Sequence, residues 1–184
     1  MRFWKVVTAI IIALGITAAL IVSAEAEERY IEKVFSFGKY SPTIHIMNAA
    51  HPSYAVEVGK DGALSWKKLR SNTDYNDVSQ CFTVLPAGSG YYAIYETLPM
   101  GGHNARCLTY EPGTGFSMKA PKRDSSGKYA STQRFLFKWY PTAKSSGKAV
   151  KNCWRIVCEK DSMGFCTGGW GYFLIRQDNW SENY

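Results

Sequence analysis

The stretch VSQCFTVLP, Val78–Pro86, returns later in the chain as STQRFLFKWYP, Ser131–Pro141. In each copy a glutamine, Gln80 or Gln133, opens an alternating run of aromatic and apolar residues. Self-similarity at a spacing of about 50 residues indicates a repeat architecture, in which each unit buries its apolar face against its neighbours. The two copies therefore predict that the rest of the chain repeats as well.

Each glutamine-led run is followed by three more strand-like runs in the same order. Behind Gln80 come GSGYYAIYE, ARCLTY and GFSMKAP, and behind Gln133 come KNCWRIVCE, GFCTGG and GYFLIRQ. A weaker first copy, without the glutamine and the cysteine, runs from Lys33 to Leu69. Four short runs in each copy, separated by Gly, Pro, Asn, Asp and Ser, predict twelve strands. The three repeats cover about 30–79, 80–132 and 133–184.

The individual runs alternate as strands do. Phe135, Phe137 and Trp139 fall on one face of their run, and the residues between them fall on the other. This period fits an antiparallel sheet with one face on a core, so most of the aromatic residues are expected inside. No stretch beyond the N-terminal segment has a helical period, and the chain is predicted to be all-β.

Three copies of four strands in about 150 residues resemble the β-trefoil. The Gln-x-Phe openings at Gln80 and Gln133, with Cys107-Leu108-Thr109 further on, resemble ricin-type carbohydrate-binding modules. The resemblance implies a β-trefoil of three four-stranded repeats with sugar pockets in its loops. The aspartate expected after the Cys-Leu of a sugar-binding repeat is Thr109 here, so the resemblance supports the fold more strongly than the pocket.

The N-terminal segment predicts export. Arg2 and Lys5 precede an uncharged run, Val6–Val22, and an A-x-A cleavage sequence comes directly after it, which is typical of a signal peptide over 1–26. An uncleaved anchor stays open, because the run is nearly long enough to span a membrane, but it too would export the rest of the chain. We expect a single secreted, extracellular domain at 27–184, with no stable membrane insertion after cleavage.

All five cysteines lie beyond the predicted signal peptide, and disulfides form in exported proteins. In a trefoil, Cys107 and Cys166 would occupy equivalent places in different repeats and would not pair. The resemblance therefore implies disulfides within repeats, Cys81 with Cys107 and Cys158 with Cys166. Cys153 would be left as the spare thiol.

The sequence contains little that indicates catalysis. The three histidines, His45, His51 and His103, lack a metal-binding spacing, and no C-x-x-C pair has a matching second pair. There is no G-x-S-x-G, Gly-rich phosphate loop or diagnostic carboxylate pair. We expect no enzyme, no metal and no cofactor.

Two loops suggest a sugar site. Trp170 lies in a glycine-rich turn, and polar side chains come one strand later, so that an aromatic platform and planar hydrogen-bonding groups come together. A turn aromatic that packs on its own domain is the alternative. The candidates are Trp170, Tyr172, Gln177, Asp178 and Asn179, with His103 and Asn104 in the parallel loop of the second repeat. Asn179 also opens an N-glycosylation sequon, which predicts a glycoprotein.

A basic patch is the second candidate site. The chain carries a formal net charge of +7, which favours acidic partners and also favours solubility. Basic residues occupy corresponding places in the first and second repeats: Lys67, Lys68 and Arg70, and Lys119, Lys122 and Arg123. Together they would suit a sulfated polysaccharide, as the basic loops of growth-factor trefoils suit heparin. Nucleic acid is not expected.

These features predict a secreted, non-enzymatic recognition protein that binds a glycan, a glycoprotein or an acidic partner through trefoil loops. One alternative is a lipocalin-like barrel carrying a small hydrophobic ligand, because Gly38-Lys39-Tyr40 resembles the G-x-W opening of that family. A protease inhibitor on the trefoil scaffold is the other.

Overall fold

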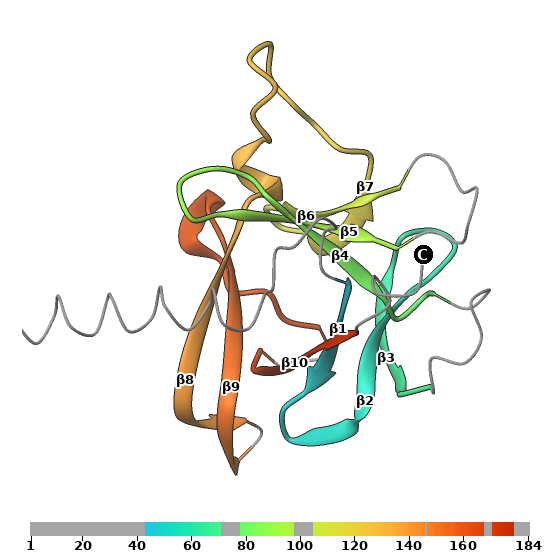
Figure 1. Ribbon diagram of the computed structural model, residues 1–184, viewed down its shortest axis with the longest axis vertical. Coiled ribbons are helices and arrows are strands. Elements are labelled where there is room, and N and C mark those ends of the chain that lie inside the picture. The colour runs from blue at the N-terminus through green and yellow to red at the C-terminus, as the bar shows by residue number, and fades with distance from the viewer. Residues whose placement is uncertain (1–42, 71–77, 98–104, 146, 168–170, 179–184) are drawn as a thin grey trace, which may run out of the picture. The chain divides into compact units, whose positions relative to one another are not determined.

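The computed structural model describes residues 43–70, 78–97, 105–145, 147–167 and 171–178 (Figure 1). The strands are β1 (Thr43–Asn48), β2 (His51–Val58), β3 (Leu64–Lys68), β4 (Phe82–Pro86), β5 (Tyr92–Glu96), β6 (Cys107–Glu111), β7 (Gly115–Lys119), β8 (Phe135–Ser145), β9 (Lys148–Cys158) and β10 (Phe173–Asp178). Two 3-10 turns, η1 (Ser131–Gln133) and η2 (Lys160–Ser162), complete the described elements. The all-β prediction is confirmed.

Some predictions concern residues outside these ranges. The predicted signal peptide, the strand expected near Lys33 and the Gly38–Tyr40 motif all lie there. Within the described part of the chain, no helix is long and apolar enough to span a membrane.

Six of the strands close an antiparallel barrel in the order β1-β10-β9-β8-β5-β4, with β4 pairing back to β1. The other four form two hairpins on this barrel: β2 and β3 continue from β1, and β6 and β7 continue from β5. Closure pairs each barrel strand on both sides and so protects its backbone edges. An eight-stranded lipocalin-like barrel is therefore not the fold.

The registers show which positions of the two glutamine-led units are equivalent. Phe82 lies opposite Glu96 in β4–β5, and Phe135 lies opposite Cys158 in β8–β9. The predicted equivalence of the two phenylalanines is confirmed by this shared position.

Two finer equivalences are wrong. Cys107 pairs with Tyr95, whereas the corresponding position of the third repeat, paired with Val157, is Gly164 and not Cys166. The final strand-like run, which the sequence places in line with β7, forms β10, and β10 is a barrel strand paired with β1 and β9. Matching residues by chemical type does not detect these changes in strand pairing.

Gln133 shows why the opening phrase recurs. Its side chain is fully buried, its Oε1 accepts from the Lys122 N–H at 2.6 Å, and its Nε2 donates to the Ala120 carbonyl at 3.0 Å. Nε2 also contacts the Thr109 hydroxyl at 2.8 Å. These bonds tie the end of the β6–β7 hairpin to the start of β8.

Gln80 makes the same bonds one repeat earlier. Its Oε1 accepts from the Arg70 N–H at 3.1 Å, and its Nε2 donates to the Lys68 carbonyl at 3.0 Å and to the Glu57 carboxylate at 3.2 Å. The β2–β3 hairpin is thereby tied to the start of β4. We call the two sets of bonds the glutamine clasps.

Aromatic side chains from β3, β7, β10 and the segment before β10 pack against one another. Phe165 packs edge-on against Phe116 at 5.2 Å and stacks on Phe173 at 5.2 Å, and Phe173 lies 6.1 Å from Trp66. The Trp66 indole also donates to the Thr167 carbonyl at 2.7 Å. The predicted core residues Phe82, Phe135, Phe137 and Trp154 are buried, and Phe116 is half-buried.

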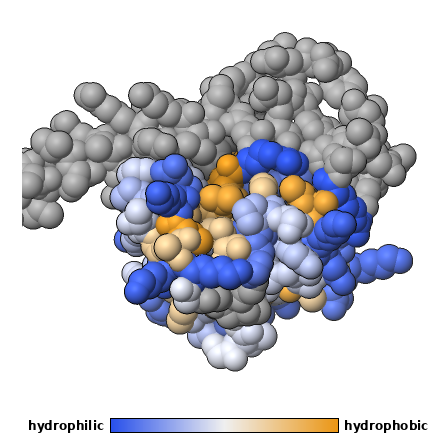
Figure 2. All heavy atoms as spheres, turned by 90° about the horizontal axis from the view of Figure 1, so that it is seen from below, coloured by the Kyte–Doolittle hydropathy of each residue, from blue (hydrophilic) through white to orange (hydrophobic). Residues whose placement is uncertain are grey.

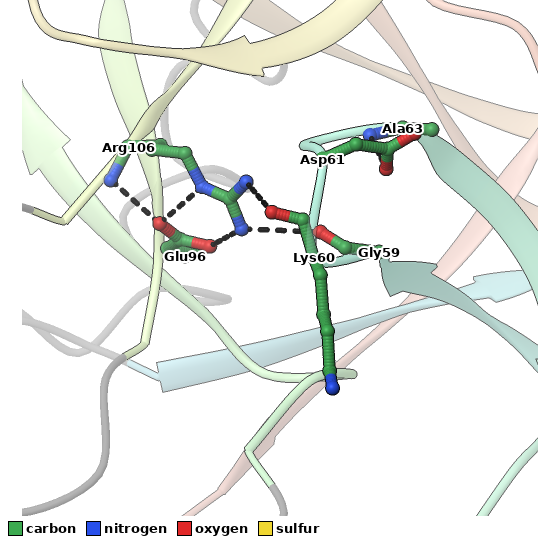
Figure 3. Close-up of polar contacts among 6 residues, drawn as sticks. All are labelled: Gly59, Lys60, Asp61, Ala63, Glu96 and Arg106. Carbon is green, nitrogen blue, oxygen red and sulfur yellow. Dashed lines mark hydrogen bonds and ion pairs between the residues drawn. The ribbon is translucent and has the colours of Figure 1, made fainter.

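An ion pair holds the first hairpin against the second (Figure 3). Arg106 donates to the Glu96 carboxylate at 2.6 and 2.7 Å, and the same guanidinium donates to the carbonyls of Lys60 at 2.9 Å and Gly59 at 3.2 Å. The hydrogen bond to Glu96 raises the pKa of Arg106. The turn of the first hairpin is thus fixed by a charged group from the second.

The predicted disulfides are absent, and all five cysteines are free thiols. Cys81 lies beside Thr97, which donates its N–H to the Cys81 carbonyl, and Cys107 lies on the other side of the same strand opposite Tyr95. Two strand spacings, about 10 Å, therefore separate Cys81 from Cys107, beyond the reach of a disulfide.

The second predicted disulfide fails for a similar reason. Phe165 donates its N–H to the Ile156 carbonyl, so Cys166 comes next, beside Arg155. Cys158 lies three residues further along β9, about 10 Å away. Cys158 is also buried, whereas Cys166 is exposed.

We predict that Gln133→Ala lowers the free energy of unfolding by about 3 kcal/mol, because it leaves buried polar groups of the β6–β7 hairpin without their partner. Urea unfolding measures this loss. The exposed β8 substitution Thr142→Ala serves as the control and should change stability by less than about 0.5 kcal/mol. Equal stability of the two variants would show that the clasp does not hold the repeat.

Two hairpin glycines form a matched pair. Gly62 and Gly113 both have positive φ, +85° and +82°, but a Cβ at Gly62 would lie 2.4 Å from the Met118 carbonyl oxygen, and at Gly113 it would meet nothing within 4 Å. Gly113→Ala should therefore cost about 1 kcal/mol of backbone strain, and Gly62→Ala more than about 3 kcal/mol. Thermal unfolding compares them, and equal costs would contradict the close approach of the hairpins.

The free thiols should label in a defined order. Burial raises the pKa of Cys107 to about 12 and that of Cys158 to about 11, and it also raises the pKa of Cys153. In the native protein iodoacetamide should modify exposed Cys166 first, because protonated buried thiols react poorly. Denatured but unreduced protein should take up five labels by intact mass, and a shortfall of two would reveal a disulfide.

Candidate functional site

Tyrosines line the outer face of β5. Tyr91 and Tyr95 flank Ala93 with the period of a strand, while Tyr92 lies on the opposite face and packs edge-on against Phe137. Beneath the outer tyrosines is a floor of small buried residues: Ala87, Ala93 and Cys107. The strand therefore presents two half-buried phenol rings over small side chains.

The loop between β7 and η1 packs onto this face. Tyr129 belongs to the same buried cluster, and it forms an antiparallel bridge with Arg123 at the base of the loop. The Asp124 carboxylate accepts hydrogen bonds from the Ser126 N–H at 2.9 Å, the Ser126 hydroxyl at 2.6 Å and the Lys128 N–H at 3.0 Å. These bonds lower the pKa of Asp124, and they hold the tip of the loop in one conformation.

Arg123 is held against Tyr129. Its guanidinium carbon lies 4.0 Å from the centre of the Tyr129 ring, and it donates to the Tyr129 hydroxyl and, at 3.2 Å, to the Gly127 carbonyl. The Tyr95 hydroxyl in turn donates to that of Tyr129 at 3.0 Å. Burial raises the pKa of Tyr129, so the phenol stays neutral at physiological pH.

A second arginine covers the neighbouring tyrosine. The Arg134 guanidinium lies 4.6 Å from the Tyr91 ring centre, donates to the Gly88 carbonyl at 3.2 Å and pairs with Glu159 at 2.7 Å. The Arg134 side chain is only 3% exposed. We call Tyr91, Tyr95, Arg123, Tyr129 and Arg134 the Tyr–Arg cluster.

The two arginines of the Tyr–Arg cluster differ in what they can still bind. Arg134 is buried and neutralised by Glu159, so its role is structural. Arg123 is exposed, and among the described contacts no carboxylate pairs with it. Its described partners are the Gly127 carbonyl and the hydroxyls of Tyr129 and Tyr95, which do not use all five of its N–H donors, so others are left for a ligand. The arrangement suits a ligand with an anionic group and an apolar face.

Burial keeps the thiol beneath the Tyr–Arg cluster protonated. Cys107, the nearest thiol, has its pKa raised to about 12 by burial and is protonated at neutral pH, when only a thiolate would be a good nucleophile. Within the described ranges, no three His, Cys, Asp or Glu residues gather as a metal-binding group would require.

The predicted sugar site is only partly described. Trp170, Asn179, His103 and Asn104 lie outside the described residues. Tyr172 is half-buried and packs edge-on against Tyr140, with ring centres 5.5 Å apart. The alternative of a turn aromatic packed on its own domain concerns Trp170, and it stays a prediction.

The polar candidates of that site lie at the far end of β10. Gln177 is paired with Ile44 and Asp178 with Thr43. Six residues of extended strand, about 20 Å, separate Tyr172 from Asp178. The backbone positions of Tyr172 and Asp178 therefore lie at opposite ends of this segment.

The predicted basic patch draws on the β2–β3 hairpin, on β7 and on the loop after β7. Arg70 comes just after β3 and pairs with Glu57 at 2.7 Å, and Lys119 ends β7 and pairs with Glu111 at 3.5 Å. The remaining members, Lys67, Lys68, Lys122 and Arg123, are exposed. β3, which carries Lys67 and Lys68, contacts β7, which carries Lys119. Only Lys122 and Arg123 lie in the loop of the Tyr–Arg cluster.

Sequence reasoning found Arg123 through its charge but missed the tyrosines of the cluster. The alternation of Tyr91, Ala93 and Tyr95 is a usable signal, because it places two aromatics on one strand face around a small residue. Nothing in the sequence pattern places Tyr129 on that face, since its position depends on how a distant loop folds back.

Comparison with known proteins adds no family. No protein-family model matches the chain, and no curated protein matches it.

Proposed function

We propose that this protein is a β-trefoil recognition protein that binds an acidic glycan through the Tyr–Arg cluster. The trefoil is supported by the six-stranded barrel with hairpins after β1 and β5, and by glutamine clasps at equivalent positions. In the third repeat, the bridge between Val157 and Gly164 occupies the place of the pair Tyr95 and Cys107. This bridge supports a third, shorter repeat unit.

The observation that carries the binding proposal is Arg123, held over the Tyr129 ring with no carboxylate partner among the described contacts. A sugar ring offers an apolar face that stacks on aromatic side chains. A sugar carboxylate or sulfate offers oxygens that match the planar donors of a guanidinium. One acidic sugar unit would bind Arg123 through its charged group and would meet the half-buried ring of Tyr95 with its apolar face.

The order of the loop favours this function. Asp124 and Tyr129 fix the backbone and the guanidinium before any ligand arrives. A side chain that is already held loses less conformational entropy on binding, so more of its interaction energy contributes to affinity. Export and a non-enzymatic role complete the proposal, as the N-terminal pattern and the absence of catalytic motifs in the sequence suggest.

The proposal predicts that Arg123→Ala weakens binding to an acidic glycan by about tenfold to a hundredfold, the effect of losing a hydrogen bond between charged groups. The measurement is a glycan array of sialylated, uronic-acid and sulfated glycans beside their neutral counterparts, followed by calorimetry on the best ligand. Arg123→Lys keeps the charge but loses the planar donors, so its affinity should be intermediate.

Lys60→Ala is the matched control, because Lys60 is exposed, carries the same charge and lies in the turn of the first hairpin. It should change affinity less than twofold, which excludes a general effect of net charge. Equal binding of neutral and acidic glycans, or an Arg123→Ala variant with full affinity, would show that the cluster is not the site.

A further inference from the structure

The β8–β9 hairpin has an unusual charge composition. Between Phe135 and Cys158 it contains five basic residues and no acidic residue. They are Lys138, Lys144, Lys148, Lys151 and Arg155. β8 and β9 are the longest described strands, 11 residues each, and Figure 1 shows them as a long paired ribbon. The excess of cations is therefore concentrated on one element.

The register places four of these cations in two groups along the hairpin. Lys138 lies directly opposite Arg155, Lys151 opposite Thr142, and Lys144 opposite Ala149. Between the first pair and the other two, Tyr140 and Cys153 lie opposite each other and pack into the apolar cluster of Ala49 and Val150. All four cations are exposed, in two groups on either side of that pair. The row spans about 20 Å from the first pair to the last. We call Lys138, Lys144, Lys151 and Arg155 the basic row.

The basic row lowers the stability of the fold, because its like charges repel one another. Like charges directly opposite each other in an antiparallel pair repel, as Lys138 and Arg155 do. Among the described residues no carboxylate forms an ion pair with any member of the row. A ligand that supplies negative charge would relieve this repulsion.

Arg155 is also held in place. Its guanidinium packs over Gly164, where a Cβ would lie 2.8 Å from Nη2 and 2.9 Å from Nε. The missing side chain at Gly164 lets the guanidinium lie close to the backbone of the third repeat. The cation at the barrel end of the row is thus positioned before a ligand binds.

We infer that the basic row is a binding site for a linear sulfated polysaccharide, independent of the Tyr–Arg cluster and of its proposed function. A linear chain of sulfates is long enough to contact both groups of cations, and each contact releases bound counterions. The ligand is recognised here by charge and by length.

The chemistry of the surrounding surface favours this occupant over other polyanions. Single-stranded nucleic acid is usually held by stacking on aromatic side chains, whereas Tyr140, the aromatic residue within this row, is half-buried against Tyr172. A membrane surface would call for a broad apolar face beside the cations. Figure 2 instead shows, on the end viewed from below, small apolar patches divided by hydrophilic groups.

The experiment measures binding of the full chain to a fluorescent heparin oligosaccharide from about 0.1 M to about 0.3 M NaCl. We compare the parent with K138Q/R155Q and K144Q/K151Q, and with the control K60Q/K160Q, which removes the same charge from exposed positions elsewhere. Each row variant should lose at least tenfold in affinity and lower the salt slope by about 2, one for each cation removed. The control should stay within twofold.

K144Q/K151Q lies away from Gly164, so it tests the row even if loss of Arg155 loosens the third repeat. Equal losses in the row variants and the control would overturn the proposal, because binding would then depend on net charge alone. Tighter binding of a DNA oligonucleotide than of heparin would also overturn it, in favour of nucleic acid. Loss in the row variants with unchanged acidic-glycan binding separates this site from the Tyr–Arg cluster.

Discussion

The amide of a buried glutamine is the interaction that ties each hairpin to the barrel. A hairpin that leaves the barrel must return to it, and its last residues would otherwise bring unpaired backbone groups against the wall. Gln80 and Gln133 satisfy an N–H and a carbonyl of the returning segment in the same way. An aromatic residue two positions later, Phe82 or Phe135, then enters the core. The hydrogen bonds of the glutamine fix the position of the returning segment, and this position directs the phenylalanine into the core.

The sequence predicted most where a residue has a single structural task. The Gln-x-Phe motif correctly marked the start of a barrel strand at Gln80 and at Gln133. A buried amide needs hydrogen-bond partners and a buried ring needs a place in the core, so the two residues have few alternative positions. The prediction failed where two residues of the same type were assumed to occupy equivalent positions in the fold. Cys107 and Cys166 are both cysteines, yet the register pairs Cys107 with Tyr95 and gives the equivalent place to Gly164. Loops of different length had shifted the chain by two residues between the repeats.

The Tyr–Arg cluster was harder to predict because its parts come together only through tertiary contacts. Charge pointed to Arg123, and alternation pointed to the outer face of β5. Tyr129 joins them because its loop is anchored at both ends, by the Arg123 bridge and by Gln133. The same limit explains the disulfides: cysteine spacing suggested pairs, but strand register placed them too far apart.

The turns of the two hairpins also differ in how much they constrain the chain. Gly62 lies under the second hairpin, whose Met118 N–H donates to its carbonyl at 2.8 Å, whereas Gly113 faces open space. Added residues at the second turn would extend away from the molecule, but at the first they would push the hairpins apart. Sequence variation and inserted segments should therefore accumulate at Gly113, which makes this turn the natural place for the scaffold to gain new loops.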